Sequence, residues 1–265
     1  MQTNNRARMG VMIGIALKLF KSVKVFKVAL VAMALSGWTI MLSFEFAVTL
    51  LAILMFHEYG HIRAMKRFGI PTKGIYIIPF VGGVAVGDSP KTHWQELYIA
   101  MMGPVFGLAM SVAFFIGFVI TDNHFVGLVA SVSALVNLVN LLPIYPLDGG
   151  RVVKALVYSG RSRFIYVGLV VISGVLIGYS FTQGFALIGF FGIMGLVDLL
   201  ADWNSFDQDP KPKLNTYGIV FSLIWYLLTA ASLIGMMVWI AALELPGSCL
   251  LYTSDAADEM DGGVL

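Results

Sequence analysis

The stretch Phe56-His57-Glu58-Tyr59-Gly60-His61 lies inside an apolar run that covers residues 46–66. A run of roughly 20 apolar residues is long enough to cross a membrane as a helix. Histidines four residues apart lie on one face of such a helix, so both imidazoles can bind one metal ion. Ionisable residues inside a membrane are rare and usually functional. We therefore predict that His57 and His61 bind zinc, and that Glu58 accepts a proton from water at the metal.

The composition of the whole chain agrees with a membrane protein. Of its 265 residues, 58% are hydrophobic and only 12% are charged, whereas a soluble domain is usually about half apolar and about one quarter charged. This balance excludes a soluble globular enzyme, a disordered chain and a protein that binds nucleic acid through a basic surface. The single cysteine, Cys249, excludes a disulfide framework and a zinc cluster built from thiolates.

Apolar runs of helical length predict an all-α polytopic membrane protein with six or seven transmembrane helices. The count is open because the fifth run is short and could form one unit with the sixth. Between the second and third runs, β-branched and aromatic residues alternate with glycine and proline, which predicts a short membrane-associated β element around residues 74–87. The runs cover residues 28–44, 46–66, 97–120, 125–142, 165–180, 184–200 and 217–241.

The basic residues predict how these helices are oriented. With seven spans, all 17 lysines and arginines fall on one side of the membrane. Basic loops stay in the cytoplasm, so we expect an integral, multi-pass membrane protein whose N-terminus is cytoplasmic.

Three segments are expected from the changes in composition along the chain. Residues 1–27 form a basic N-terminal segment with lysines at every third position from 18 to 27, typical of an amphipathic helix on the membrane surface. An ordinary basic flank before the first spanning helix explains these lysines equally well. Residues 28–246 form the membrane domain. Residues 247–265 contain clustered acids without hydrophobic periodicity, and we expect them to be a non-native or disordered tail.

A third candidate ligand, Asp148, lies in the stretch Asn140-Leu141-Leu142-Pro143-Ile144-Tyr145-Pro146-Leu147-Asp148-Gly149-Gly150. Two prolines end the preceding helix and two glycines permit an unusual backbone path, which frees the aspartate to point into the bundle. The alternative is a turn in which the aspartate caps the next helix. Because His61 and Asp148 both lie just before basic residues, we expect both motifs near the cytoplasmic face. We interpret His93 and His124 as ordinary polar residues.

Together, the two stretches resemble the signature of the site-2 proteases, which are intramembrane zinc metalloproteases. The segments at 79–85 and 100–104 also resemble segments of that family. The resemblance implies that His57, His61 and Asp148 bind one Zn²⁺ per chain and that Glu58 is the catalytic base. It also implies that Asn140 stabilises an oxyanion or binds substrate.

The same resemblance implies an enzyme that hydrolyses peptide bonds in or near the transmembrane segments of membrane-protein substrates. We expect a minimal catalytic core that works in the lipid bilayer, without a PDZ insertion or a nucleotide-sensing domain and without a nucleic-acid partner. An unwound substrate segment could add to the β element as a strand. The candidate substrate-binding residues are Gly82, Gly83, Val84 and Pro146. The oligomeric state is left open.

Two other classes of protein stay open. A membrane metalloprotease of the prenyl-protein type would share the zinc helix but take its third ligand from a glutamate on a later helix, and neither Glu96 nor Glu244 has a suitable context. A non-enzymatic transporter or scaffold would use the metal structurally, in a closed site with four protein ligands.

Overall fold

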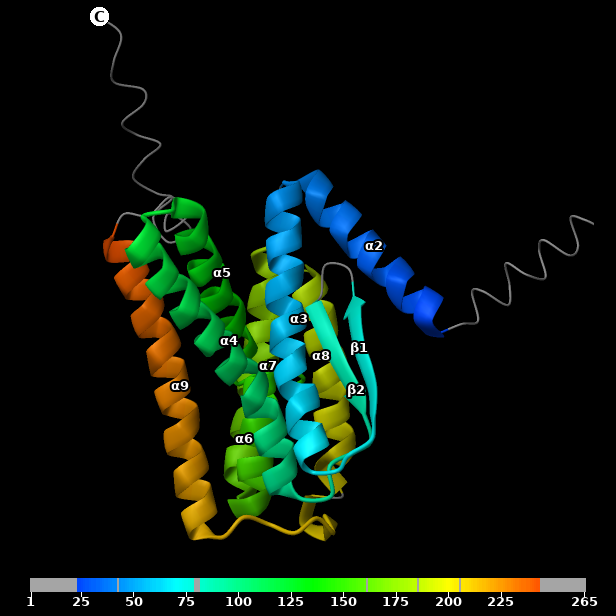
Figure 1. Cartoon of the computed structure of the whole chain (residues 1–265). Coiled ribbons are helices and arrows are strands. Elements are labelled where there is room, and N and C mark those ends of the chain that lie inside the picture. The colour runs from blue at the N-terminus through cyan, green and yellow to red at the C-terminus, as the bar shows by residue number, and fades with distance from the viewer. Residues whose placement is uncertain are drawn as a thin grey trace, which may run out of the picture.

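The computed structural model describes residues 23–41, 43–78, 82–160, 162–184, 186–204 and 206–243. The expectations for residues 1–22 and for the tail at 247–265 lie outside these ranges. The chain is mainly helical, with one pair of strands (Figure 1). The elements are α2 (Val23–Met41), α3 (Phe44–Arg67), β1 (Thr72–Ile78), β2 (Gly82–Gly87), α4 (His93–Thr121), α5 (His124–Asn140), α6 (Asp148–Gly160), α7 (Arg163–Thr182), α8 (Ala186–Ala201), the short 3-10 helices η1 (Asp202–Asn204) and η2 (Phe206–Gln208), and α9 (Thr216–Ala242).

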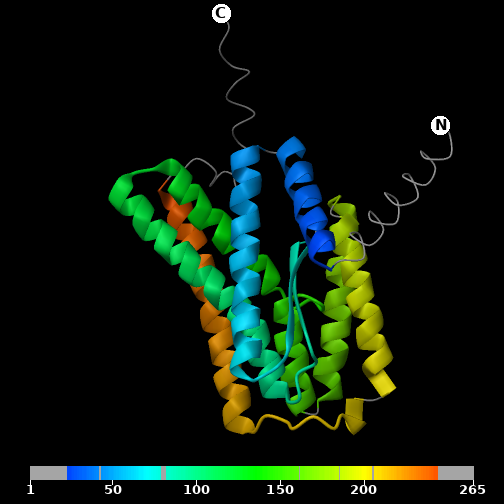
Figure 2. The same ribbon diagram turned by 45° about the vertical axis from the view of Figure 1, so that its right-hand side comes forward.

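Helix α4 is the centre of the bundle, because it packs against α3, α5, α6 and α9. Its buried residues Leu97, Ala100 and Met101 join residues of α5, α6 and α9 in one hydrophobic cluster. The hairpin of β1 and β2 lies on the opposite side of α3 from α4, α5 and α9 (Figure 2). Helix α3 therefore runs between the helical core and the hairpin, with contacts to both.

The predicted β element is present as an antiparallel hairpin. Its register pairs Ile78 with Gly82 at one end and Thr72 with Gly87 at the other, with an irregularity between Thr72 and Gly74. Gly74 has a φ angle of +102° at this irregularity, a backbone conformation that glycine adopts without steric cost. Lys27 Nζ donates a hydrogen bond of 2.7 Å to the carbonyl of Lys73, so α2 is attached to the first strand.

The predicted apolar runs all coincide with helices, but they do not all have the length of a membrane span. Within the described residues, α4, α7 and α9 are long and apolar enough to cross a membrane, whereas α5 is shorter. Six or seven spans therefore stay a prediction. Helix α6 was not among the predicted runs, because Asp148, Arg151 and Lys154 give it a mixed composition.

Side-chain caps explain where several helices begin. Ser43, Thr92, Ser162 and Asn215 precede α3, α4, α7 and α9, and each side chain accepts a hydrogen bond from a backbone N–H three residues later. Such caps satisfy an N–H group that would otherwise have no partner, with a typical contribution of about 1 kcal/mol.

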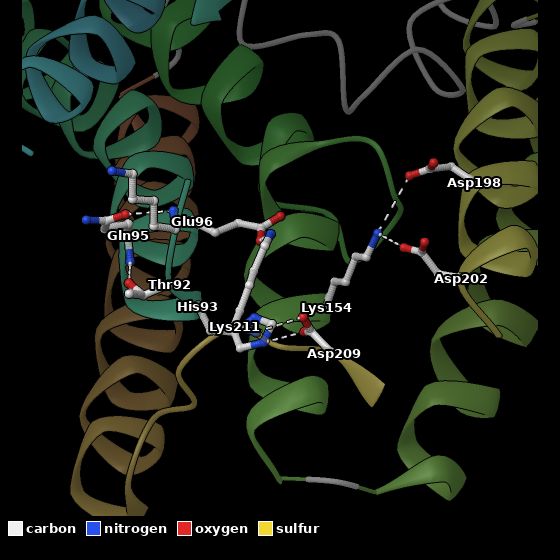
Figure 3. Close-up of polar contacts among 10 residues, drawn as sticks. Thr92, His93, Gln95, Glu96, Lys154, Asp198, Asp202, Asp209 and Lys211 are labelled. Carbon is white, nitrogen blue, oxygen red and sulfur yellow. Dashed lines mark hydrogen bonds and ion pairs between the residues drawn. The ribbon is translucent and has the colours of Figure 1, made fainter. Parts of the chain in front are cut away.

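The end of α3 and the beginnings of α4 and α9 lie at one end of the bundle (Figure 1). Segments that belong to this end carry Arg63, Lys66, Arg67, Lys91, Lys211 and Lys213. The connection from α8 to α9 is also attached here by polar contacts to α4 and α6. Two are ion pairs, Glu96–Lys211, at 3.1 Å, and Lys154–Asp202, at 2.6 Å, and the third joins Nε2 of His93 to Oδ2 of Asp209, at 2.7 Å (Figure 3).

Candidate metal centre

Helix α3 places its two histidines and the intervening glutamate in the interior of the bundle. The exposed fractions of His57, Glu58 and His61 are 2%, 5% and 4%. Residues four apart follow one another on the same helix face, and the two imidazole rings lie 4.8 Å apart between centroids. The sequence spacing therefore gives the predicted arrangement.

Asp148 reaches the same place from the start of α6. Its side chain is buried, and Oδ2 lies 3.0 Å from Nε2 of His57 and 3.1 Å from Nε2 of His61. The two glycines that follow allow the loop before α6 to fold back tightly. A Cβ atom on Gly149 would lie 2.1 Å from the carbonyl oxygen of Leu141, closer than real Cβ contacts. The carboxylate thus contacts both histidines. This agrees with the prediction that the prolines and glycines around Asp148 free it to point into the bundle.

The three converging atoms have the spacing of ligands around a small cation. Nε2 of His57 and Nε2 of His61 are 3.0 Å apart, so each of the three separations is 3.0 or 3.1 Å. Tetrahedral ligands about 2.0 Å from a zinc ion would be separated by about 3.3 Å. These residues form a buried group that could hold a metal ion.

The hydrogen bonds behind the histidines direct electron pairs toward this centre. Nδ1 of His61 lies 2.7 Å from the carbonyl oxygen of Ile99. A carbonyl only accepts, so Nδ1 carries the proton and Nε2 of the neutral ring has the lone pair. Nδ1 of His57 is paired with Oδ1 of Asn137 at 2.7 Å. Two nitrogen lone pairs and a carboxylate repel one another unless a cation lies between them, so this donor set fits a divalent metal.

Glycines provide the space for this group. A Cβ atom on Gly103 of α4 would lie 2.4 Å from Nε2 of His61 and 2.7 Å from Nε2 of His57. A Cβ atom on Gly60 would lie 2.3 Å from the backbone oxygen of Met102. Helices α3 and α4 therefore approach closely at two glycines, and the imidazoles occupy the space beside Gly103.

Glu58 faces the hairpin. A Cβ atom on Gly83 of β2 would lie 2.4 Å from Cγ of Glu58 and 2.9 Å from its Oε1, so the strand backbone runs directly past this side chain. Gly82 precedes Gly83 in β2, and a Cβ atom on Gly82 would lie 3.9 Å from Cδ2 of Leu54. Val84, which follows Gly83, is 40% exposed. The candidate base and the candidate substrate-binding strand thus lie side by side.

The other predicted site residues lie outside the group of three. Asn140 is the last residue of α5 and is half-buried, and Pro146 packs beside Gly195 of α8. His93 contacts Asp209, and His124 is exposed at the start of α5. Neither histidine belongs to the group of three. Their interpretation as ordinary polar residues stays a prediction.

Sequence reasoning missed Asn137, which contacts His57 from α5 and is 0% exposed. The sequence does contain a signal, because Asn137 is an amide in the middle of an apolar run. A buried polar side chain needs hydrogen-bond partners, so such a residue is a candidate for a contact with the site.

Comparison with known proteins gives a family match over this region. The model described as Peptidase family M50 matches residues 45–123 and 120–177. The matched ranges run from 45 to 177, just over half of the 265 residues, and they contain the metal group and the hairpin.

Three curated proteins are similar to the chain. The protein sll0528 of Synechocystis sp. is 29% identical over 172 residues, which are 59% of this chain and 42% of the relative. Rip3 of Mycobacterium tuberculosis is 34% identical over 46% of this chain and 33% of its own length. MJ0392 of Methanocaldococcus jannaschii is 29% identical over 58% of this chain and 46% of its own length. The names of all three contain the term zinc metalloprotease. The matched region spans less than half of each relative.

Proposed function

Because the chain belongs to peptidase family M50, we propose that it is a zinc-dependent intramembrane protease. It hydrolyses peptide bonds in or near the transmembrane segments of other membrane proteins. The observation that carries the proposal is the convergence of His57, His61 and Asp148 within 3.1 Å of one another in the interior of the bundle. Family membership does not favour the transporter or scaffold.

We assign the three side chains as the protein ligands of one zinc ion. A zinc ion held by these three side chains would lower the pKa of water and polarise the carbonyl of the scissile bond. A structural zinc site is closed by four protein ligands, whereas a catalytic site has three and leaves one position open. Within the described residues the group contains three candidate ligands, which supports the catalytic assignment.

Glu58 is the proton carrier in this proposal. Its carboxylate accepts a proton from the attacking water and then delivers it to the amine that leaves. The side chain is buried beside the histidines on α3 and is flanked by the backbone of Gly83, so its position is restricted from two sides. Asn140, at the end of α5 and before the loop to Asp148, donates a hydrogen bond to the oxyanion or to the substrate backbone.

The substrate is bound as an extended strand. A helix uses its carbonyl groups in internal hydrogen bonds, so a transmembrane segment must unwind before its backbone can be attacked. The sheet has only two strands in the described part of the chain, and an edge strand offers free backbone groups for β-strand addition. Addition along Gly82, Gly83 and Val84 would bring the substrate past Glu58. Pro146 belongs to the loop before α6, two residues before Asp148.

We propose that the active site lies near the cytoplasmic face. His61 is two residues before Arg63, and Asp148 is three residues before Arg151. The bundle end to which α3 runs also carries the basic connections before α4 and α9. Basic loops are retained in the cytoplasm, which supports a cytoplasmic N-terminus and a multi-pass integral protein.

The test uses the full chain reconstituted in liposomes together with a panel of single-span membrane proteins. Wild type should cleave at least one of them, and Glu58→Gln should be slower by about 10²-fold or more, the usual scale for general acid–base catalysis. Zinc content is measured in the same samples and should be unchanged. Equal cleavage by both proteins would contradict the assigned mechanism, and cleavage by neither would favour the scaffold.

A further inference from the structure

We propose that Asn137 is a positioning residue of the metal centre, and that Gly107 preserves the space that its amide needs. The amide fixes the ring orientation and the tautomer of His57. This inference deepens the proposed function and rests on it, since it concerns how one zinc ligand is held.

The hydrogen bonds of Asn137 determine which way its amide points. Nδ2 donates a hydrogen bond of 2.7 Å to the carbonyl oxygen of Ser133. Oδ1 is therefore the atom that faces Nδ1 of His57, at 2.7 Å. An amide oxygen only accepts, so Nδ1 of His57 must carry the proton and Nε2 has its lone pair free. That nitrogen is the one directed at Asp148 and His61.

The amide lies where a side chain of the neighbouring helix would otherwise be. A Cβ atom on Gly107 of α4 would lie 1.9 Å from Cγ and Nδ2 of Asn137 and 2.0 Å from Oδ1. Even alanine at position 107 would thus collide with all three atoms of the amide group. The helices are held together around this point by a hydrogen bond of 3.0 Å from Ser133 Oγ to the carbonyl of Gly107.

The two histidines differ in what orients them. His61 is paired with the backbone carbonyl of Ile99, which a substitution at that position would leave in place. His57 is paired with a side chain, so its orientation depends on the identity of residue 137. Partners of metal-binding histidines typically change metal affinity by about 10- to 100-fold when they are removed. Asn137→Ala is expected to act on zinc binding through His57.

A matched control separates positioning from packing. Ser111 is also completely buried between α4 and α5, and its Oγ donates a hydrogen bond of 2.7 Å to the carbonyl of Ala130. Ser111→Ala removes a buried hydrogen bond from the same helix pair, and a typical cost is about 1 kcal/mol of stability. The hydrogen-bond partner of Ser111 is a backbone carbonyl of α5 and none of the three candidate ligands.

A second variant moves the amide from one helix to the other. In the double variant Asn137→Gly with Gly107→Asn, the new side chain starts beside the space of the wild-type amide and should return an acceptor to His57. The exchange is motivated by distance, because the Cβ position at 107 lies 2.0 Å from Oδ1 of Asn137.

The experiment measures zinc affinity of the purified full chain by competition with a chelator, and the absorption spectrum after Co²⁺ replaces Zn²⁺. We expect Asn137→Ala to bind zinc about 10- to 100-fold more weakly and to show an altered cobalt spectrum. Ser111→Ala should match wild type in both, and the double variant should recover most of the lost affinity. Wild-type affinity in Asn137→Ala, or equal weakening in Asn137→Ala and Ser111→Ala, would overturn the inference.

If Asn137→Ala does not fold, the double variant tests whether an amide at this place positions His57. A folded double variant with near wild-type zinc affinity supports the inference, and a folded one that binds zinc poorly overturns it. Failure of the proposed function gives a different result, because wild type would then bind no zinc, or would bind zinc and cleave no substrate, whereas failure of this inference leaves both properties of wild type intact.

Discussion

Oδ2 of Asp148 lies 3.0 Å from Nε2 of His57, although one residue opens α6 and the other lies within α3. Helix α4 packs against both of these helices, so its own residues control how closely they approach. The metal centre therefore depends on residues that carry no ligand atom, and this dependence leads to the first prediction.

Gly103→Ala should abolish most zinc binding and slow cleavage by about 100-fold or more, because the new methyl group would lie 2.4 Å from Nε2 of His61. Gly174→Ala on α7 is the matched control, since nothing lies within 4 Å of its Cβ position. That control should keep zinc and activity. The measurement is zinc content and cleavage rate in one preparation, and normal zinc binding by Gly103→Ala would show that the described fit is wrong.

Gly83→Ala should act on Glu58 and leave the metal in place. The added Cβ would lie 2.4 Å from Cγ of Glu58, so the glutamate must move away from its present position. We expect cleavage to fall by about 10-fold or more, while zinc content stays at the wild-type level. Loss of zinc together with activity would indicate that the hairpin supports the ligands instead of the base.

Opposite ends of α4 should be labelled from opposite sides of the membrane. Single cysteines replace Thr92, before the helix, and Asn123, after it, in a chain with Cys249→Ser. An impermeant thiol reagent should reach position 92 only from the cytoplasm and position 123 only from the other side, because the basic residues flank the first of these. Labelling of both positions from one side would refute the orientation.

Lys154→Met should lower the melting temperature at neutral pH but not in strong alkali. Burial alone would lower the pKa of Lys154, but its hydrogen bond to Asp202 and the neighbouring negative charges raise the pKa overall. A raised folded-state pKa means that the ammonium stabilises the fold below the usual value of about 10.4, and that this stability is lost as the pH rises further.

The loss at pH 7 should be about 1 kcal/mol, the scale of a partly exposed ion pair. Thermal unfolding of both proteins in detergent is compared at pH 7 and above pH 11, with Lys66→Met as the exposed control. A difference that persists unchanged at high pH would mean that the lysine acts through packing of its carbon chain.

Local patterns predicted the parts of the site that local geometry governs. The spacing of His57 and His61 on one helix face needs no tertiary information, and prolines and glycines marked the loop before Asp148. The hairpin followed in the same way from β-branched residues next to glycine. Each of these features is decided within one short stretch of chain.

Features that depend on packing between helices were not accessible to the same reasoning. The contact between Asn137 and His57 requires α3, α4 and α5 to pack together beside Gly107. The spacing of apolar residues along the sequence does not predict which helices pack together. Helix α6 was overlooked as an element because its basic residues interrupt the apolar pattern. The number of spans likewise depends on how far short helices such as α5 extend through a bilayer.

Zinc content of the purified chain tests most directly the central claim, that His57, His61 and Asp148 together hold a catalytic metal ion. Wild type is compared with His57→Ala, His61→Ala and Asp148→Ala, and with His124→Ala, which changes an exposed histidine away from the group. We expect one zinc ion per chain in wild type and in His124→Ala, and loss of most of the zinc in each of the three ligand variants. Full zinc content in the ligand variants would contradict this assignment.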